Sequence, residues 1–144
     1  MAPLIVLIVV TGLARAAGWL HATDWLDSWP HAVRIGLAAM FALTSSAHFL
    51  QPRRDGLIAM VPPRLPNPAA LVTLTGVLEL AGAIGLLIPW AAPLAAICLA
   101  VMLVFLFPAN VRAAQEGSGI QTMPLPARTL VQVVFIAACV LAAF

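Results

Sequence analysis

Long apolar runs, separated by short polar or proline-containing segments, set the pattern of this sequence. Each run comes close to the about 20 residues that an α-helix needs to cross the hydrocarbon core of a bilayer. The alternation with period two that indicates strands is missing, and an open sheet cannot satisfy its edge backbone groups in lipid. The pattern therefore predicts an all-α membrane protein, a bundle of about five transmembrane helices over residues 3–20, 31–51, 68–88, 91–112 and 127–144.

Tryptophan and proline mark the ends of these runs. The indole ring prefers the headgroup level of a membrane, and the tryptophans near run ends are Trp19, Trp25, Trp29 and Trp90. Proline is tolerated in the first turn of a helix because its missing N–H has no partner there in any case. Prolines in that position open the second, third and fourth runs, at Pro30, Pro68 and Pro93.

Composition supports a membrane protein and excludes a typical soluble domain. The chain has 144 residues, of which 63% are hydrophobic and only 8% charged, whereas soluble domains carry about 25% charged residues. The mean hydropathy is +1.07. The length suits one domain, which we place over residues 1–144. The net charge of +2 is small and scattered, so we expect no nucleic-acid partner.

The arginines predict how the bundle lies in the cell membrane. Five of them fall in or beside the two loops on the N-terminal side of the bundle, namely Arg53, Arg54, Arg64, Arg112 and Arg128. The opposite side has Asp24 and Asp27, with Arg15 and Arg34 inside their spans. Because basic residues are retained on the cytoplasmic side, we expect a cytoplasmic N-terminus and a C-terminus outside.

The first run has a second interpretation, as a secretory signal peptide. Its apolar stretch is followed by Ala14-Arg15-Ala16, which resembles a cleavage site with small residues. The positively charged segment that normally precedes such a stretch is missing. We therefore expect a transmembrane helix here, and the predicted orientation is the same under either interpretation.

One carboxylate, Glu79, stands near the middle of the third run. An ionisable side chain at the bilayer centre costs about 2.5–3.5 kcal/mol on insertion scales, which makes it a functional candidate. At about 1.5 Å per residue, Glu79 lies about 16 Å from the cytoplasmic end of its span. Small and partly polar residues share its helical face, which predicts that Glu79 faces the bundle interior; they are Thr75, Gly76, Gly82 and Ala83.

A buried carboxylate needs a partner, and two arginines are candidates. Arg34 lies near the outer start of the second run and Arg15 near the outer end of the first. We expect Arg34 to pair with Glu79, because it belongs to the adjacent helix, and keep Arg15 as the alternative. Such a pair has two interpretations: it takes part in binding or chemistry, or it only fixes the register of two helices.

His48 ends the second run, with Thr44 and Ser45 on the same helical face. A neutral imidazole at this place can relay protons or hydrogen-bond to a ligand carbonyl. The alternative is a histidine that is hydrogen-bonded at the membrane interface and has no chemical role.

Two further features point to a pocket near His48 and Glu79. Pro108 interrupts the fourth run and frees backbone groups near Asn110, which either line a polar site or end the helix. Beside its three arginines, the segment 51–68 has the apolar residues Leu57, Ile58, Met60 and Val61. We expect it to lie on the cytoplasmic leaflet or to form a lid over a pocket of His48, Glu79 and Asn110.

The usual redox and metal motifs are missing from the sequence. Cys98 and Cys139 each stand alone in an apolar run, so a thiol–disulfide relay lacks its reactive pair. The histidines show no metal-ligand spacing, and we predict no metal site. We interpret both cysteines as small apolar side chains.

Four motifs together resemble the DoxX family of small bacterial membrane proteins. They are Ser45-Ser46-Ala47-His48-Phe49, "VPPRLPNP" at 61–68, "LTGVLELAGAIGLL" at 74–87 and "FPANV" at 107–111. The resemblance covers about residues 31–144 and implies a four-helix core like that of the vitamin K epoxide reductase superfamily, here with an additional N-terminal helix. It also implies a link to redox systems, since some relatives are subunits of thiosulfate:quinone oxidoreductase.

The function expected from these features is that of a quinone-associated or redox-accessory membrane subunit. Without paired cysteines, a redox role would use a bound quinone as cofactor or a protein partner in a membrane complex. Glu79 and His48 are the candidate catalytic residues, and the candidate ligand-binding residues are Arg15, Arg34, His48, Glu79 and Asn110. The alternatives are a non-enzymatic scaffold or assembly partner and a small-molecule or proton carrier. Small-residue faces also permit a homo-oligomer.

Overall fold

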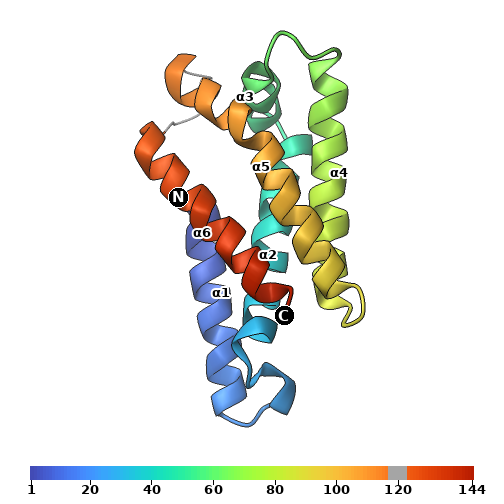
Figure 1. The fold of residues 1–144 in the computed structure, drawn as a ribbon, viewed down its shortest axis with the longest axis vertical. Coiled ribbons are helices and arrows are strands. Elements are labelled where there is room, and N and C mark those ends of the chain that lie inside the picture. Colours follow the sequence, from blue (N-terminus) through green and yellow to red (C-terminus); the bar gives the residue numbers. More distant parts are fainter. Residues whose placement is uncertain (117–122) are drawn as a thin grey trace.

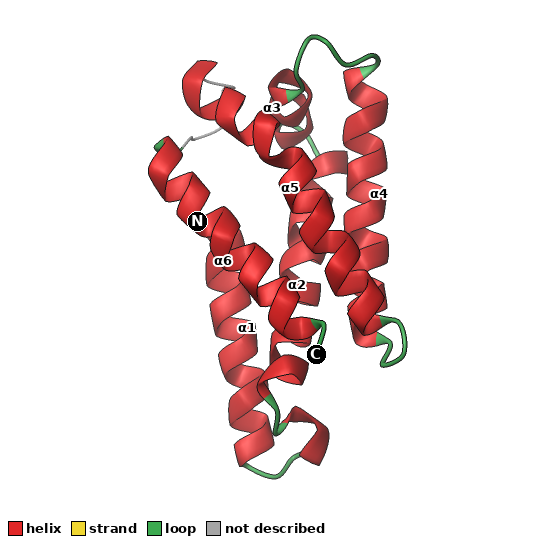
Figure 2. Ribbon diagram, viewed as in Figure 1, coloured by secondary structure: helices red, strands yellow, loops and turns green. Residues whose placement is uncertain are grey.

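The described part of the chain consists mainly of helices joined by short loops in a computed structural model, which describes residues 1–116 and 123–144 (Figures 1 and 2). No strand occurs among these residues. In chain order the elements are α1 (Ala2–Trp19), the short 3-10 helix η1 (Asp24–Leu26), α2 (Trp29–Phe49), α3 (Arg53–Met60), α4 (Pro68–Leu87), α5 (Ala92–Glu116) and α6 (Leu125–Ala142). Five of the described helices are long and apolar enough to cross a membrane, which confirms the predicted fold class.

The helix bounds follow the apolar runs closely, with one exception. The other predicted ends lie within two residues of the observed ones, but α5 continues to Glu116 instead of ending near residue 112. Pro108 lies inside α5 and does not end it. A proline removes one backbone donor and disturbs one turn, and the residues after Pro108 are compatible with a helix and continue it.

Polar caps at the starts of α2 and α4 fix the positions of these two helices. Ser28 Oγ accepts a hydrogen bond from the His31 backbone N–H at 3.3 Å, and Asn67 Oδ1 accepts one from the Ala70 N–H at 3.3 Å. Each cap satisfies a donor that has no partner inside the helix. Asn67 has a φ of 49°, in the left-handed region that asparagine tolerates better than most residues.

The long helix α2 lies at the centre of the bundle. It packs against α1, α4 and α6, while α5 packs against α4 and α6 on the other side. The short helix α3 lies across one end of the bundle, beside the last turns of α2 and the first turns of α4 (Figure 1). The buried apolar cluster takes side chains from all five long helices, including Leu7, Phe41, Leu86, Leu99 and Cys139.

Polarity is distributed as expected for a protein surrounded by lipid. Large apolar side chains cover the outside of the bundle, among them Ile8, Leu94, Val104, Phe105 and Leu130. Six polar side chains among the described residues of the long helices are buried inside the bundle, namely Arg15, Arg34, Ser45, His48, Glu79 and Gln132. A surface of this kind would be unfavourable in water, because it would expose large contiguous apolar patches.

Candidate functional site

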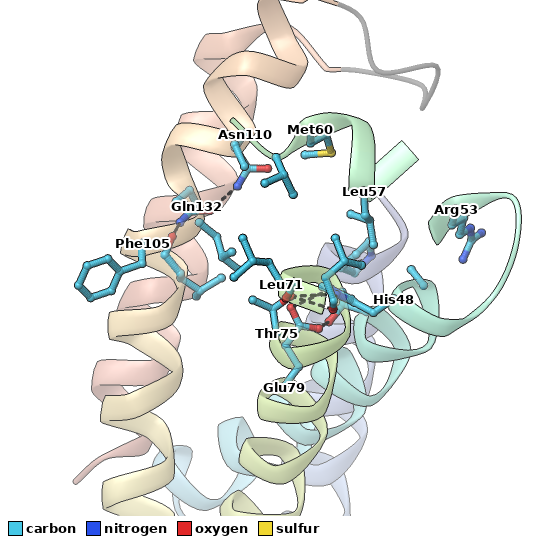
Figure 3. A pocket seen from close by; sticks show the side chains of 18 of the residues that line it. His48, Arg53, Leu57, Met60, Leu71, Thr75, Glu79, Phe105, Asn110 and Gln132 are labelled. Carbon is cyan, nitrogen blue, oxygen red and sulfur yellow. Dashed lines mark hydrogen bonds and ion pairs between the residues drawn. The ribbon is translucent and has the colours of Figure 1, made fainter. Parts of the chain in front are cut away.

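A cavity of about 630 Å³ opens at the end of the bundle that α3 covers. Its walls come from α2, α3, α4, α5 and α6 and from the first residues of the chain (Figure 3). Most lining side chains are apolar, for example Leu57, Met60, Leu71, Leu106 and Phe135. The volume lies within the range of about 300–1,000 Å³ that is typical of small-molecule sites.

His48 from α2 and Glu79 from α4 meet in one wall of this cavity, and we call them the acid–imidazole pair. A distance of 3.5 Å joins His48 Nε2 to Glu79 Oε1. Glu79 is 5% exposed and His48 is 7% exposed. The prediction that Glu79 faces the bundle interior is therefore confirmed, and the structure brings it together with His48 in one site.

The contacts around the acid–imidazole pair limit which of its atoms can carry a hydrogen. His48 Nδ1 lies 2.8 Å from the Val72 carbonyl oxygen, which only accepts, so Nδ1 carries a hydrogen. A neutral His48 then presents the Nε2 lone pair to Glu79, and an ionised Glu79 presents another lone pair. Two acceptors repel, whereas one proton between Nε2 and Oε1 gives an attractive contact with no net charge. An attractive contact between the two groups therefore requires one proton, on Nε2 or on Oε1.

Hydroxyl groups support both members of the pair. Thr44 Oγ1 donates to Glu79 Oε2 at 2.8 Å, and Thr75 Oγ1 lies 3.1 Å from His48 Nδ1. Ser45 Oγ donates to the Gly76 carbonyl oxygen at 2.9 Å, which ties α2 to α4 between these contacts. The polar face predicted from Thr44, Ser45 and His48 thus serves as the contact surface of α2 toward α4.

Gly76 allows the two helices to come close enough for these bonds. A Cβ atom at this position would lie 2.5 Å from His48 Cβ, which is closer than real Cβ atoms approach. The small face around Glu79 is therefore a close helix–helix contact, as the sequence predicts. Gly82, on the same helix, faces Leu99 of α5 instead.

A second polar group lies on the opposite wall, where α5 meets α6 (Figure 3). Arg128 Nη1 donates to Asn110 Oδ1 at 3.1 Å, and Asn110 Nδ2 donates to Gln132 Oε1 at 3.4 Å. Gln132 Nε2 donates in turn to the Leu103 carbonyl oxygen. We call Arg128, Asn110 and Gln132 the donor chain.

Sequence reasoning identified only one member of the donor chain, Asn110. Gln132 is buried in the bundle. Its place as a polar residue inside an apolar run is a sequence feature that could have indicated this. Arg128 was counted only as a loop charge. Its part in the site depends on the close packing of α5 against α6, which the sequence does not reveal.

The segment predicted to form a lid does cover the cavity. Leu57 and Met60 of α3 line it from above the acid–imidazole pair. Arg54 holds α3 in place, because it donates to the His48 carbonyl oxygen and, at 2.9 Å, to Thr73 Oγ1. Arg112 of α5 donates to the Val61 carbonyl oxygen just beyond α3.

The predicted partner of Glu79 was wrong. Arg34 is buried near the other end of α2, and its Nε donates to the Ala142 carbonyl oxygen at 2.8 Å. Arg34 and His48 are separated by about 21 Å along α2, at about 1.5 Å per residue, so Arg34 does not reach Glu79. The last carbonyls of α6 have no partners within their helix and carry partial negative charge, so they attract the guanidinium group.

Arg15, the alternative partner, also lies at the other end of the bundle. Its Nη1 donates to the Leu26 carbonyl oxygen and to Asp27 Oδ1, both at 3.0 Å. Its guanidinium carbon lies 5.1 Å from the ring centroids of both Trp19 and Trp29. Neither Arg15 nor Arg34 lines the cavity, so these two predicted ligand-binding residues are not brought together with Glu79, His48 and Asn110.

We expect Arg15→Gln to lower the free energy of unfolding by about 2 kcal/mol. The substitution removes two cation–π contacts, each of about 0.5–1 kcal/mol, and a hydrogen bond to the Leu26 carbonyl of about 1 kcal/mol. The pair with Asp27 adds little because that carboxylate is mostly exposed. Thermal unfolding in detergent, followed by tryptophan fluorescence, measures the change.

The exposed Arg53 offers a matched control, because Arg53→Gln removes the same charge without removing such contacts. Equal stability of the two variants would contradict the role given to Arg15.

One comparison with known proteins identifies a family for this chain. The family model described as domain of unknown function DUF8561 matches residues 37–143. The chain belongs to this family. The matched range contains His48, Glu79, Asn110 and Gln132 and leaves out α1 and the start of α2. No curated protein and no solved structure gives a significant match.

Proposed function

We propose that this DUF8561 protein binds a lipophilic ligand of the quinone class in the cavity and serves as an accessory subunit of a membrane redox system. One observation carries the proposal: a buried carboxyl group and an imidazole in contact with it lie in the wall of an apolar cavity. A quinone has an uncharged ring that suits apolar walls and carbonyl oxygens that accept hydrogen bonds from the few polar groups of such a cavity.

The pair has the composition needed to handle a proton beside such a ligand. A carboxyl group and an imidazole in contact can pass a proton to a ligand oxygen within hydrogen-bond reach. In this proposal the chain supplies the binding site and the proton, and a partner protein supplies electrons. Glu79 and His48 remain the candidate catalytic residues, and Arg34 and Arg15 have no part in the site.

Two further considerations support the proposal. The motifs of the site, from Ser45 to Phe49 and from Leu74 to Leu87, are those that resemble DoxX proteins, some of which belong to quinone-linked complexes. The cavity also lies at the bundle end near Arg53 and Arg54. By the distribution of arginines we place this end at the cytoplasmic face of the cell membrane.

A second candidate function, a scaffold without chemistry, rests on a different observation. Glu79 and His48 both have partners within the bundle, and Ser45 joins the same two helices. A pair of this kind stabilises a specific helix packing whether or not a ligand binds. The two functions differ in one respect that an experiment can measure, namely whether a ligand accompanies the folded protein.

We expect the organic extract of the detergent-purified protein to contain a membrane quinone, detected by mass spectrometry at close to one molecule per chain. Glu79→Gln is expected to reduce this content at least tenfold, since an amide cannot hold the shared proton and loses a charge-assisted contact. Asp24→Asn, an exposed carboxylate far from the cavity, is the matched control and should retain the quinone.

The scaffold function predicts a different result. Extracts of the wild type and of both variants would be equally free of quinone, and Glu79→Gln would melt at a lower temperature. That outcome would refute quinone binding and would direct the search toward a stoichiometric protein partner.

A further inference from the structure

We infer that the donor chain is a second ligand-binding subsite, which recognises an acceptor oxygen at the end of the ligand opposite to the acid–imidazole pair. The inference rests on the proposed function, since it requires a ligand in the cavity. It adds what the ligand must look like: two oxygen-bearing ends separated by an apolar body.

The orientation of the donor chain follows from its two ends. Arg128 only donates hydrogen bonds, so Asn110 must turn its oxygen toward Arg128 and its amide nitrogen toward Gln132. The Leu103 carbonyl only accepts, so Gln132 must turn its amide nitrogen toward Leu103. Both amides are therefore held in one orientation, and the hydrogen bonds run in one direction, from Arg128 through Asn110 and Gln132 to the Leu103 carbonyl.

This orientation leaves donors available to the cavity. Each amide nitrogen has two hydrogens and uses one of them within the donor chain, so Asn110 and Gln132 keep one each, and both residues line the cavity. Arg128 is not among the residues that line the cavity, and within the described residues its buried Nε atom has no hydrogen-bond partner. The guanidinium group adds positive charge behind the amides. The subsite therefore favours a carbonyl or carboxylate oxygen.

The donor chain lies beside the part of α5 that Pro108 disturbs. Pro108 lacks the N–H that would bond to the carbonyl four residues earlier, and its ring disturbs the preceding turn. Gln132 reaches the Leu103 carbonyl in that turn and so ties α6 to the altered part of α5. Asn110 lies two residues after the proline and points into the cavity (Figure 3).

The two polar walls differ in chemistry, and this selects the ligand. The acid–imidazole pair offers a carboxyl and an imidazole group that can pass a proton to a ligand oxygen, whereas the donor chain offers donors and a positive charge. A ring with two carbonyl groups on opposite sides satisfies both walls. A fatty acid has an acceptor oxygen for the donor chain but brings no second oxygen to the acid–imidazole pair.

The test measures binding of three probes to the full chain in lipid nanodiscs. They are a decyl-substituted 1,4-benzoquinone, a decyl-substituted cyclohexenone with one carbonyl, and decanoate. We expect the wild type to bind the quinone about tenfold more tightly than the one-carbonyl probe, the usual effect of one buried hydrogen bond. In Asn110→Leu this ratio should fall to about one.

Two further variants make the result independent of folding. Asn110→Asp keeps the shape and the contact with Arg128 but removes the donor, so it should lower the ratio as Asn110→Leu does. Arg64→Gln removes an exposed arginine and should leave the ratio unchanged. Because the readout is a ratio of two affinities on one protein, a general loss of stability does not alter it.

Each outcome has a definite meaning. A ratio that stays near ten in both Asn110 variants overturns the second subsite but leaves quinone binding intact. Tight binding of decanoate that Asn110→Leu weakens tenfold supports the subsite and identifies a carboxylate as its ligand. Failure of the wild type to bind any of the three probes overturns the proposed function together with the subsite.

Discussion

Replacing Gly76 with alanine is expected to lower the free energy of unfolding by about 1–3 kcal/mol and to disrupt the acid–imidazole pair. The added Cβ atom would lie 2.5 Å from His48 Cβ and 3.0 Å from a ring carbon of Phe49. His48 Cβ is bonded directly to the backbone and cannot rotate away, so α2 and α4 must separate. Alanine favours a helix by about 1 kcal/mol over glycine, and the steric effect at this contact outweighs that gain.

The separation has consequences beyond the contact itself. Ser45 loses part of its hydrogen bond to the Gly76 carbonyl, and the 3.5 Å contact between His48 and Glu79 lengthens. Gly76→Ala should therefore also reduce the quinone content of the purified protein. Unfolding in a mixed-micelle titration gives the free energy, and the same samples give the ligand content.

Gly12 in α1 provides a matched control for this prediction. An added Cβ atom at Gly12 meets no atom within 4 Å, so Gly12→Ala changes helix propensity without a clash. We expect this variant to be as stable as the wild type or up to about 1 kcal/mol more stable. If Gly76→Ala were equally stable, the close approach of α2 and α4 described above would be incorrect.

The fold could be predicted largely because lipid imposes a simple rule. A helix must remain apolar for about 20 residues to span the hydrocarbon core, and proline and tryptophan mark where the spans end. Pro30 and Pro68 lie in the first turns of α2 and α4, as their positions in the sequence predict. Pro108 shows the limit of this reasoning, because the same residue type inside α5 only disturbs the helix.

The site could be predicted only in part, since a sequence gives the depth of a residue but not its lateral neighbours. Glu79, His48 and Asn110 were placed in one pocket from their depths and helical faces, and all three line the cavity. The sequence favours Arg34 as the partner of Glu79 because Arg34 belongs to the adjacent helix, but its guanidinium group bonds to a carbonyl at the end of α6 instead. Gln132 was overlooked because a neutral amide carries a weaker signal than a charge.

The largest effect is expected from removing one member of the acid–imidazole pair. His48→Leu takes away the imidazole that lies 3.5 Å from Glu79, in a bundle where Glu79 is 5% exposed. Breaking a buried pair in this way typically costs about 3–5 kcal/mol, because the remaining charge has no compensation. Glu79→Leu leaves His48 buried without its carboxyl partner, and the bond to the Val72 carbonyl is then its main remaining polar contact.

The double variant His48→Leu/Glu79→Leu should be more stable than the sum of the two single effects predicts. Two apolar side chains of similar volume leave no buried charge behind and fit an apolar bundle, and such replacements are often neutral or stabilising. We expect a coupling energy of about 2–3 kcal/mol in a double-mutant cycle. Unfolding measured in the same micelles for the wild type and the three variants gives this value.

The Arg15–Asp27 pair is the control for the coupling energy between His48 and Glu79. Its N···O distance of 3.0 Å is shorter than the 3.5 Å of the acid–imidazole pair, but the Asp27 side chain is 56% exposed. Solvent screening limits such a pair to about 1 kcal/mol or less. A coupling at His48 and Glu79 no larger than that at Arg15 and Asp27 would refute the shared proton, because only burial makes the longer contact the stronger one.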